Sequence, residues 1–336
     1  MDNLTPCVEQ LDLSSSLLDT HSSVRSRLSL ILTDNIIELL AHQKCVELFR
    51  NDFFNLLAKK YTEQERKEAL GKGFDQKFKF LARHKEITEW ERDMALLIHP
   101  FRNEAYHLGI AFDDIIFELS WVYHELACNL VLKMKPTFNT IPKIEAAPEG
   151  ARKHLNNFDD SGLVNWIGVS NSLHASRPDM TRNLSRALRD SAISRLDGIN
   201  RLIDLIAKDG DTPKSHNEII RIVQYSHALF EDKPDGYSTP EEIEDYHKRR
   251  RILDENWKPF INSNSLTRWR TRADQIVSIK DSVTALTKFI NLTQDFSHFE
   301  ELVRERAISQ FAFKQLVAKL AEKNNDGISK EIETME

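Results

Sequence analysis

Residues 87–108 read ITEWERDMALLIHPFRNEAYHL and carry the clearest helical pattern in the chain. Apolar side chains recur at steps of three and four, the spacing that places them on one face of an α-helix. The pattern keeps its phase through Pro100, where a proline removes one backbone hydrogen bond and bends a helix. We therefore expect one kinked helix that ends at Gly109. Its apolar face consists of Ile87, Trp90, Met94, Leu97, Ile98, Phe101, Ala105 and Leu108.

Composition and spacing together predict an all-α protein. The chain has 336 residues, of which 40% are hydrophobic and 29% charged, so it can bury a substantial core. It holds only 10 glycines and 10 prolines, fewer than folds built from strands and tight turns usually need. Apolar steps of three and four extend the helical pattern to both sides of the segment above.

The helical pattern has interruptions that suggest domain boundaries. Residues 1–22 are rich in Ser and Asp and predict a flexible N-terminal arm, whereas residues 23–135 predict an antiparallel bundle of four or five helices. Prolines and a glycine in residues 136–157 predict a linker. We expect a helical C-terminal domain over residues 158–322 and a frayed tail over residues 323–336. Within the C-terminal domain, the spacing predicts helices over about 180–207, 266–292 and 296–320.

Net charge and cysteine usage restrict the classes of partner. The formal net charge of −6 argues against binding a long duplex through backbone charge alone, so any contact with nucleic acid must be local. Cys7, Cys45 and Cys128 are far apart and lack metal-ligand spacing, which favours reduced thiols. The N-terminus has no signal-peptide pattern, and no apolar run reaches about 18 residues. We expect a soluble, cytoplasmic protein with no membrane partner.

The helix over residues 87–108 also carries a polar face. At about 100° per residue, Asn103 and His107 fall opposite the apolar face, with His99 and Tyr106 beside them and Arg102 on the flank. Histidine can act as a general base or acid near neutral pH, and arginine can bind and stabilise phosphate oxygens. These residue types suit the cleavage of a phosphodiester. In RNA the 2′-OH supplies the nucleophile, so the pattern calls for no metal and no cofactor.

A short motif on this face resembles that of a known family. The run Arg102-Asn103-Glu104-Ala105-Tyr106-His107 resembles the Arg-Asn-x-x-x-His signature of the HEPN superfamily (higher eukaryote and prokaryote nucleotide-binding domains). The setting is similar too, because a helix leads into the motif, Gly109 follows closely, and Asp113-Asp114 precede the next apolar helix. The resemblance covers residues from about 24 to 135.

The resemblance implies a metal-independent endoribonuclease that works as a homodimer with a composite site. It assigns catalysis to Arg102 and His107, with Asn103 as their polar partner, and leaves Tyr106 and His99 in supporting positions. The implied reaction is attack of the 2′-OH on the adjacent phosphate, which leaves a 2′,3′-cyclic phosphate. Such proteins occur in toxin–antitoxin and anti-phage defence systems, so an antitoxin or defence-system protein is an expected partner besides RNA.

The chain departs from the family pattern at two positions. Many members have a glycine directly after the histidine, whereas here Leu108 separates His107 from Gly109. Some toxins of the family carry a tyrosine two residues after the histidine, which an antitoxin modifies, and Gly109 occupies that position here. Regulation by this route is therefore in doubt.

Other interpretations of these residues remain open. A polar helix face is ordinarily a solvated surface, and the bundle could be a non-catalytic HEPN module that binds a partner or a nucleotide, or a helical adaptor. A second candidate for RNA contact is a set of basic residues in the C-terminal half, although such runs are often solvated helix faces as well. The set comprises Arg249, Arg250, Arg251, Arg268 and Arg270.

Overall fold

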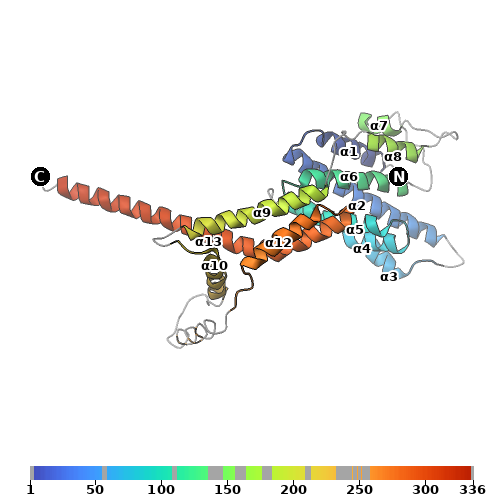
Figure 1. The fold of residues 1–336 in the computed structure, drawn as a ribbon. Helices are drawn as coiled ribbons and strands as arrows, with labels where there is room; N and C mark the ends of the chain where they lie inside the picture. The colour runs from blue at the N-terminus through green and yellow to red at the C-terminus, as the bar shows by residue number, and fades with distance from the viewer. Residues whose placement is uncertain are drawn as a thin grey trace. The chain divides into compact units, whose positions relative to one another are not determined.

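The computed structural model describes most of the chain (Figure 1). The described residues are 4–54, 59–107, 112–134, 147–155, 164–175, 184–208, 213–231, 244, 248, 251 and 258–333, and the side chains of 4, 104–107, 227–231, 313 and 316–333 lie outside the description. Regular secondary structure within these ranges is α-helical throughout, which confirms the all-α class. The helices are α1 (Leu4–Leu17), α2 (Ser23–Phe53), α3 (Glu63–Ala69), α4 (Phe74–Arg83), α5 (Glu89–His107), α6 (Ile116–Lys133), α7 (Glu149–Leu155), α8 (Trp166–Ala175), α9 (Leu184–Ala207), α10 (His216–Glu231), α12 (Ser263–Ile276) and α13 (Ser282–Glu333).

The chain divides into two compact units. Unit 1 comprises residues 1–191 together with 278–287, and unit 2 comprises residues 192–277 and 288–336. In unit 1, α2 is the central helix, since α1, α3, α4, α5 and α6 all pack against it. Unit 2 has its own core, in which Trp269 of α12 contacts the rings of Phe296 and Phe299 on α13.

The first helix corrects the expectation of a flexible arm over residues 1–22. Residues 4–17 form α1, and Cys7, Val8, Leu11 and Leu18 are completely buried. The Ser14 hydroxyl is also buried and bonds two hydroxyls of α2, Ser29 Oγ at 2.7 Å and Thr33 Oγ1 at 2.8 Å. Serines therefore occupy core-facing positions, which hides the helical period when only apolar residues are counted.

The buried face of α1 leads to a stability prediction with a matched control. Leu11 is fully buried, whereas Leu13 on the same helix is 49% exposed. We expect Leu11→Ala to lower the free energy of unfolding by about 3 kcal/mol, because it removes buried methyl groups and leaves a cavity. Leu13→Ala should change it by less than about 0.5 kcal/mol. Urea titrations followed by tryptophan fluorescence measure both, and equal effects of the two variants would contradict the packing of α1.

One short helix corrects the predicted linker over residues 136–157, and a second corrects the predicted start of the C-terminal domain at residue 158. Residues 149–155 form α7, which packs on α1, and α8 packs on both α6 and α7. The side chains of Ala151 and Leu155 are buried, as are those of Val169 and Leu173 on α8. These contacts place both helices in unit 1, and the boundary between the units falls at residues 191–192, inside α9. Residues 136–146 and 156–157 lie outside the described residues.

The helix boundaries near the C-terminus differ from those expected. Instead of a break between residues 292 and 296, α12 ends at Ile276 and α13 begins at Ser282. Asp281 marks the start of α13, because its Oδ2 accepts a hydrogen bond from the Thr284 backbone N–H at 2.8 Å. The helical backbone of α13 continues to Glu333, through most of the segment expected to fray.

Candidate active site

Helix α5 provides the platform of the candidate site. It runs from Glu89 to His107 with Pro100 inside it, which confirms the predicted continuous helix. Its N-terminus is capped by Thr88, whose Oγ1 accepts from the Glu91 backbone N–H at 3.2 Å while Glu91 Oε2 accepts from the Thr88 backbone at 2.8 Å. The apolar face is buried as expected at Met94, Ile98 and Phe101. Gly109, the predicted end of this helix, lies outside the described residues.

A buried carboxylate on α2 gathers the polar side chains of α5. Asp34 is only 1% exposed. Its Oδ1 accepts a hydrogen bond from Tyr123 Oη at 2.6 Å, and the His99 imidazole Nδ1 lies 2.9 Å from the same oxygen. Arg102 Nε lies 3.5 Å from Oδ2. A buried charge costs free energy unless it is paired and hydrogen-bonded, and these three groups supply the pairing.

The environment of Tyr123 keeps it a hydrogen-bond donor. Complete burial raises the pKa of its phenol well above the usual value of 10, and the negative charges of Asp34 and Glu38 raise it further. The positive charge of Arg102 acts in the opposite direction with a smaller effect. Tyr123 therefore stays protonated at physiological pH and holds Asp34 from the α6 side.

His99 contacts the protein interior through both its ring face and its Nδ1 atom. Its ring stacks on Phe74 of α4, with centroids 3.9 Å apart and planes at 9°. Its Nδ1 lies within 3.1 Å of both Asp34 oxygens, and 24% of its side chain is exposed. With Asp34 ionised, Nδ1 is the donor in this contact. These contacts give His99 a positioning role, linking α5 to α2 and α4.

Arg102 and Asn103 are in direct contact. The Arg102 guanidinium donates from Nη1 to Asn103 Oδ1 at 2.9 Å. The Arg102 side chain is 34% exposed, so it reaches solvent while Asp34 holds its Nε. The helical backbone continues to His107, which preserves the four-residue spacing from Asn103 that places two residues on one face. The side chains of Tyr106 and His107 lie outside the described residues.

Sequence reasoning missed Asp34, although the sequence holds a signal for it. Asp34 occupies a core position of α2, with buried Leu30, Ile37 and Ala41 at helical steps before and after it. A carboxylate at such a position needs partners from neighbouring helices. Tyr123 and Phe74 cannot be singled out in this way, because aromatic residues in apolar positions are ordinary core residues.

A pocket opens beside this cluster on the same face of α2. Glu38 and His42 follow Asp34 at successive four-residue steps. The pocket has a volume of about 380 Å³ and lies between α2 and the connection from α3 to α4. Its lining consists of Asn35, Glu38, Leu39, His42, Leu70, Gly71, Lys72 and Lys77.

Lys77 organises the wall of the pocket. Its Nζ donates to the backbone carbonyls of Gly71 at 2.8 Å and Gly73 at 3.3 Å. The same Nζ lies 3.8 Å from Glu38 Oε1, and the lysine is only 3% exposed. The buried cation therefore fixes the connection between α3 and α4 against α2.

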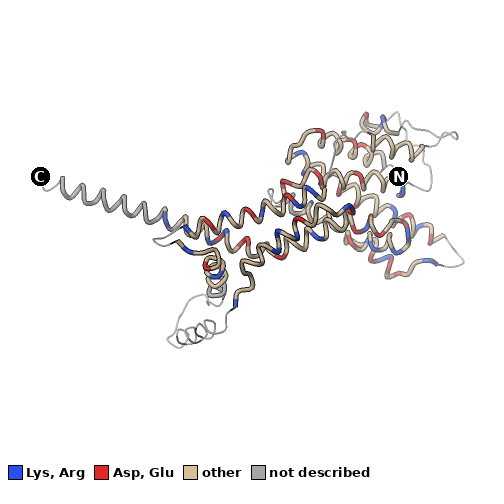
Figure 2. Tube along the Cα trace, viewed as in Figure 1, with Lys and Arg blue, Asp and Glu red and all other residues tan. Residues whose placement is uncertain are grey.

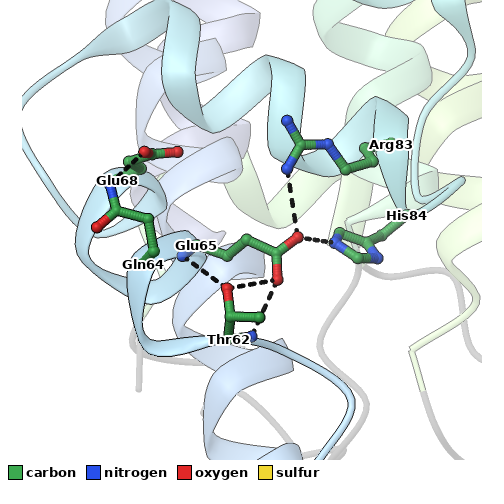
Figure 3. Close-up of polar contacts among 6 residues, drawn as sticks. All are labelled: Thr62, Gln64, Glu65, Glu68, Arg83 and His84. Atoms are coloured by element: carbon green, nitrogen blue, oxygen red, sulfur yellow. Dashed lines mark hydrogen bonds and ion pairs between the residues drawn. The ribbon is translucent and has the colours of Figure 1, made fainter.

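Glu65 links the start of α3 to the end of α4 (Figure 3). Its carboxylate accepts from the Thr62 backbone N–H at 2.9 Å, which completes a capping box at the start of α3. It also receives His84 Nε2 at 3.0 Å and Arg83 Nη1 at 3.3 Å from the end of α4. The hydrogen bond from Thr62, followed by that from His84, lowers the pKa of Glu65 from 4.5 to about 2.

The lowered pKa of Glu65 predicts a pH-dependent contribution to stability. A carboxylate with a lowered pKa in the folded state stabilises fully above its unfolded value of 4.5, and the stabilisation is lost as pH falls toward about 2. We expect Glu65→Gln to destabilise by about 1 kcal/mol at about pH 6, because solvent screens the contacts of Arg83, whose side chain is 60% exposed. The difference from wild type should shrink steadily below about pH 4. Urea titrations over this range test it, with Glu63→Gln on the exposed face of α3 as the control.

Arg268 and Arg270, two of the basic residues proposed for RNA contact, make separate local contacts within unit 2. Arg270 forms an ion pair with Asp197 of α9. Arg268 Nη2 donates to Ser265 Oγ at 3.1 Å within α12. Arg251 is exposed, and Arg249 and Arg250 lie outside the described residues. Basic and acidic residues are interspersed along the described helices, as Figure 2 shows.

Among the described residues, no helix has the length and apolarity needed to cross a membrane. In the same residues, no three His, Cys, Asp or Glu side chains are grouped so that they could hold a metal ion. Comparison of the chain with family models, curated proteins and solved structures returns no match.

Proposed function

We propose that the α5 site is that of a metal-independent HEPN-type endoribonuclease, formed between two copies of the chain. The observation that carries the proposal is the placement of Arg102. Its guanidinium is held from the interior by Asp34 and laterally by Asn103, yet remains partly exposed. An arginine held in this way presents a partly exposed guanidinium that can bind a phosphodiester.

The proposed reaction assigns a role to each group. The 2′-oxygen of the RNA forms a bond to the adjacent phosphorus, and the bond from phosphorus to the 5′-oxygen breaks. His107 accepts the 2′-OH proton as the general base, and the His107 of the second copy donates a proton to the departing 5′-oxygen. Arg102 stabilises the charge on the non-bridging oxygens. The products carry a 2′,3′-cyclic phosphate and a 5′-hydroxyl.

The setting proposed for this reaction follows from the same resemblance. RNA is the substrate, and an antitoxin or another component of an anti-phage defence system is the proposed protein partner. In unit 2, Arg268 and Arg270 make local contacts with Ser265 and Asp197. A role in controlling unit 1 is proposed for unit 2.

A second candidate function is a non-catalytic module that binds a nucleotide. The pocket beside Asp34 favours it, because it offers polar and apolar groups without contributions from the motif residues. Under this alternative, Arg102 and Asp34 form an ion pair that stabilises the bundle.

Incubation of the full-length protein with total RNA in EDTA distinguishes the two functions. Nuclease activity predicts fragments whose ends are 2′,3′-cyclic phosphates, detected by their resistance to 3′-ligation until the ring is opened and the phosphate removed. The same incubation should be repeated with extract from phage-infected cells, which supplies a trigger or partner. Absence of fragments under both conditions would contradict the nuclease and favour the nucleotide-binding module.

A further inference from the structure

We propose that the pocket between α2 and the α3–α4 connection binds a guanine base of the RNA beside the cleaved phosphate. This inference rests on the proposed function, because it names the part of the substrate that the neighbouring pocket recognises. Its volume of about 380 Å³ falls within the range usual for small-molecule sites, about 300–1,000 Å³.

The position of the pocket relative to Arg102 is set by one helix. Asp34 holds Arg102, and Glu38 follows one turn later on the same face of α2, about 6 Å along the helix axis. The negative charge of Glu38 acts on Tyr123, whose hydroxyl donates to Asp34, so Glu38 lies near the same phenol. A nucleotide whose phosphate contacts Arg102 would therefore bring its base to the pocket containing Glu38.

The carboxylate of Glu38 is the group that selects the base. Its side chain is 43% exposed, in contrast to the buried Asp34, and its contact with Lys77 Nζ is 3.8 Å long. A contact of this length is an ion pair rather than a hydrogen bond, so the carboxylate oxygens keep acceptor capacity in the pocket.

Only guanine presents two parallel donors to a carboxylate on its Watson–Crick edge. Its N1–H and 2-amino group can both donate to Glu38, in a paired hydrogen bond to a charged acceptor. Adenine and cytosine each present a single amino donor beside a ring nitrogen that accepts. Uracil presents one N–H between two carbonyl oxygens, which a carboxylate repels. The charge of Glu38 therefore favours guanine over the other three bases.

The other residues that line the pocket suit a flat base and the RNA backbone. Leu39 and Leu70 supply apolar surface, and His42 supplies an aromatic ring at the pocket. Bases in single-stranded RNA are commonly bound by stacking on such rings. Lys72 is exposed at the same pocket and provides a cation for the RNA backbone.

Binding of RNA that cannot be cleaved tests this proposal independently of catalysis. Hexanucleotides with 2′-O-methyl groups throughout lack the attacking hydroxyl, so calorimetry with the full-length protein measures recognition alone. A hexamer containing one guanine among uracils should bind at least about tenfold more tightly than those with adenine, cytosine or uracil at that position. Equal affinities for the four hexamers would overturn the proposal.

Two variants locate the interaction in the pocket. Glu38→Gln should remove the preference for guanine, since an amide presents one donor and one acceptor. Leu39→Trp should weaken binding of every hexamer by filling the pocket. Glu89→Gln is the matched control, because Glu89 is an exposed glutamate at the start of α5 and should leave the preference unchanged. A guanine preference that survives in Glu38→Gln would overturn the assignment of Glu38.

Two further measurements are needed. The first distinguishes a free nucleotide from RNA as the source of the guanine, and the second distinguishes failure of the pocket proposal from failure of the proposed nuclease. Tighter binding of free GTP than of the guanine-containing hexamer would assign the pocket to a free nucleotide and overturn the RNA proposal. Preference for the guanine hexamer without cleavage of ordinary RNA would refute the nuclease but support the pocket. Cleavage of RNA with no preference for any base would refute the pocket and leave the nuclease supported.

Discussion

Replacing Arg102 by alanine is expected to lower the rate of RNA cleavage by about 10³-fold. The guanidinium stabilises charge that develops on the phosphate oxygens in the transition state, and removal of such a donor typically costs about 10²–10³ in rate. Values of kcat/KM on one labelled oligonucleotide in EDTA give the comparison. His107→Ala should cause a loss of similar size. The double variant should be little slower than either single variant, because the two residues act in one step.

Arg102→Lys and Arg92→Ala sharpen this prediction. Lysine keeps the positive charge but cannot offer one nitrogen to Asp34 while others contact Asn103 and a phosphate, so Arg102→Lys should also lose most activity. Arg92 lies on α5 as well, where it pairs with Glu89 and Asp93 on the helix surface. Arg92→Ala should retain wild-type cleavage. An Arg102→Ala protein that cleaves RNA at the wild-type rate would refute the proposed site.

Replacing Asp34 by alanine is expected to lower the free energy of unfolding by about 3–5 kcal/mol, the usual cost of breaking a buried ion pair. The substitution leaves Tyr123 without its acceptor and removes the anchors of His99 and Arg102. Cleavage by the protein that remains folded should fall by more than about tenfold, because Arg102 is no longer oriented. Urea titrations and assays at a temperature where the variant is folded measure the two effects separately.

Tyr123→Phe distinguishes the structural from the positioning role of Asp34. It removes one hydrogen bond from the same carboxylate and should cost about 1–2 kcal/mol of stability. Because Arg102 and His99 keep their contacts with Asp34, cleavage should stay within a few-fold of wild type. If Asp34→Ala were as stable and as active as wild type, the buried cluster would have neither role.

The helical class and the course of α5 follow from the sequence because both depend on local spacing. The apolar positions around Pro100 keep one phase, and the helix accordingly continues through it. The course of α1 is not predictable in this way, since Ser14 and Ser15 occupy buried positions that usually hold apolar residues. The predicted domain boundary is also wrong, because the contacts of α7 with α1 join segments that are distant in sequence.

The candidate site is predictable only in the part that lies on one helix. Arg102 and Asn103 are neighbours along α5, and the structure brings their side chains into contact. The assembly of Asp34, Tyr123 and Phe74 around this helix depends on three other helices, whose relative placement no local pattern defines. His99 shows the difference, since its place on the polar face suggested exposure, yet its ring contacts Phe74 and Asp34.

The hydroxyl of Ser14 has a consequence for the way α1 joins the bundle. An apolar helix face can slide along its neighbour by one turn with little loss of buried area, but here a shift would leave Ser29, Thr33 and Ser14 without their partners in the buried interior. Each stranded polar group costs about 1–3 kcal/mol. The three hydroxyls therefore fix the position of α1 along α2. A chain with alanine at all three positions would keep its helices yet lose the unique alignment of the first one.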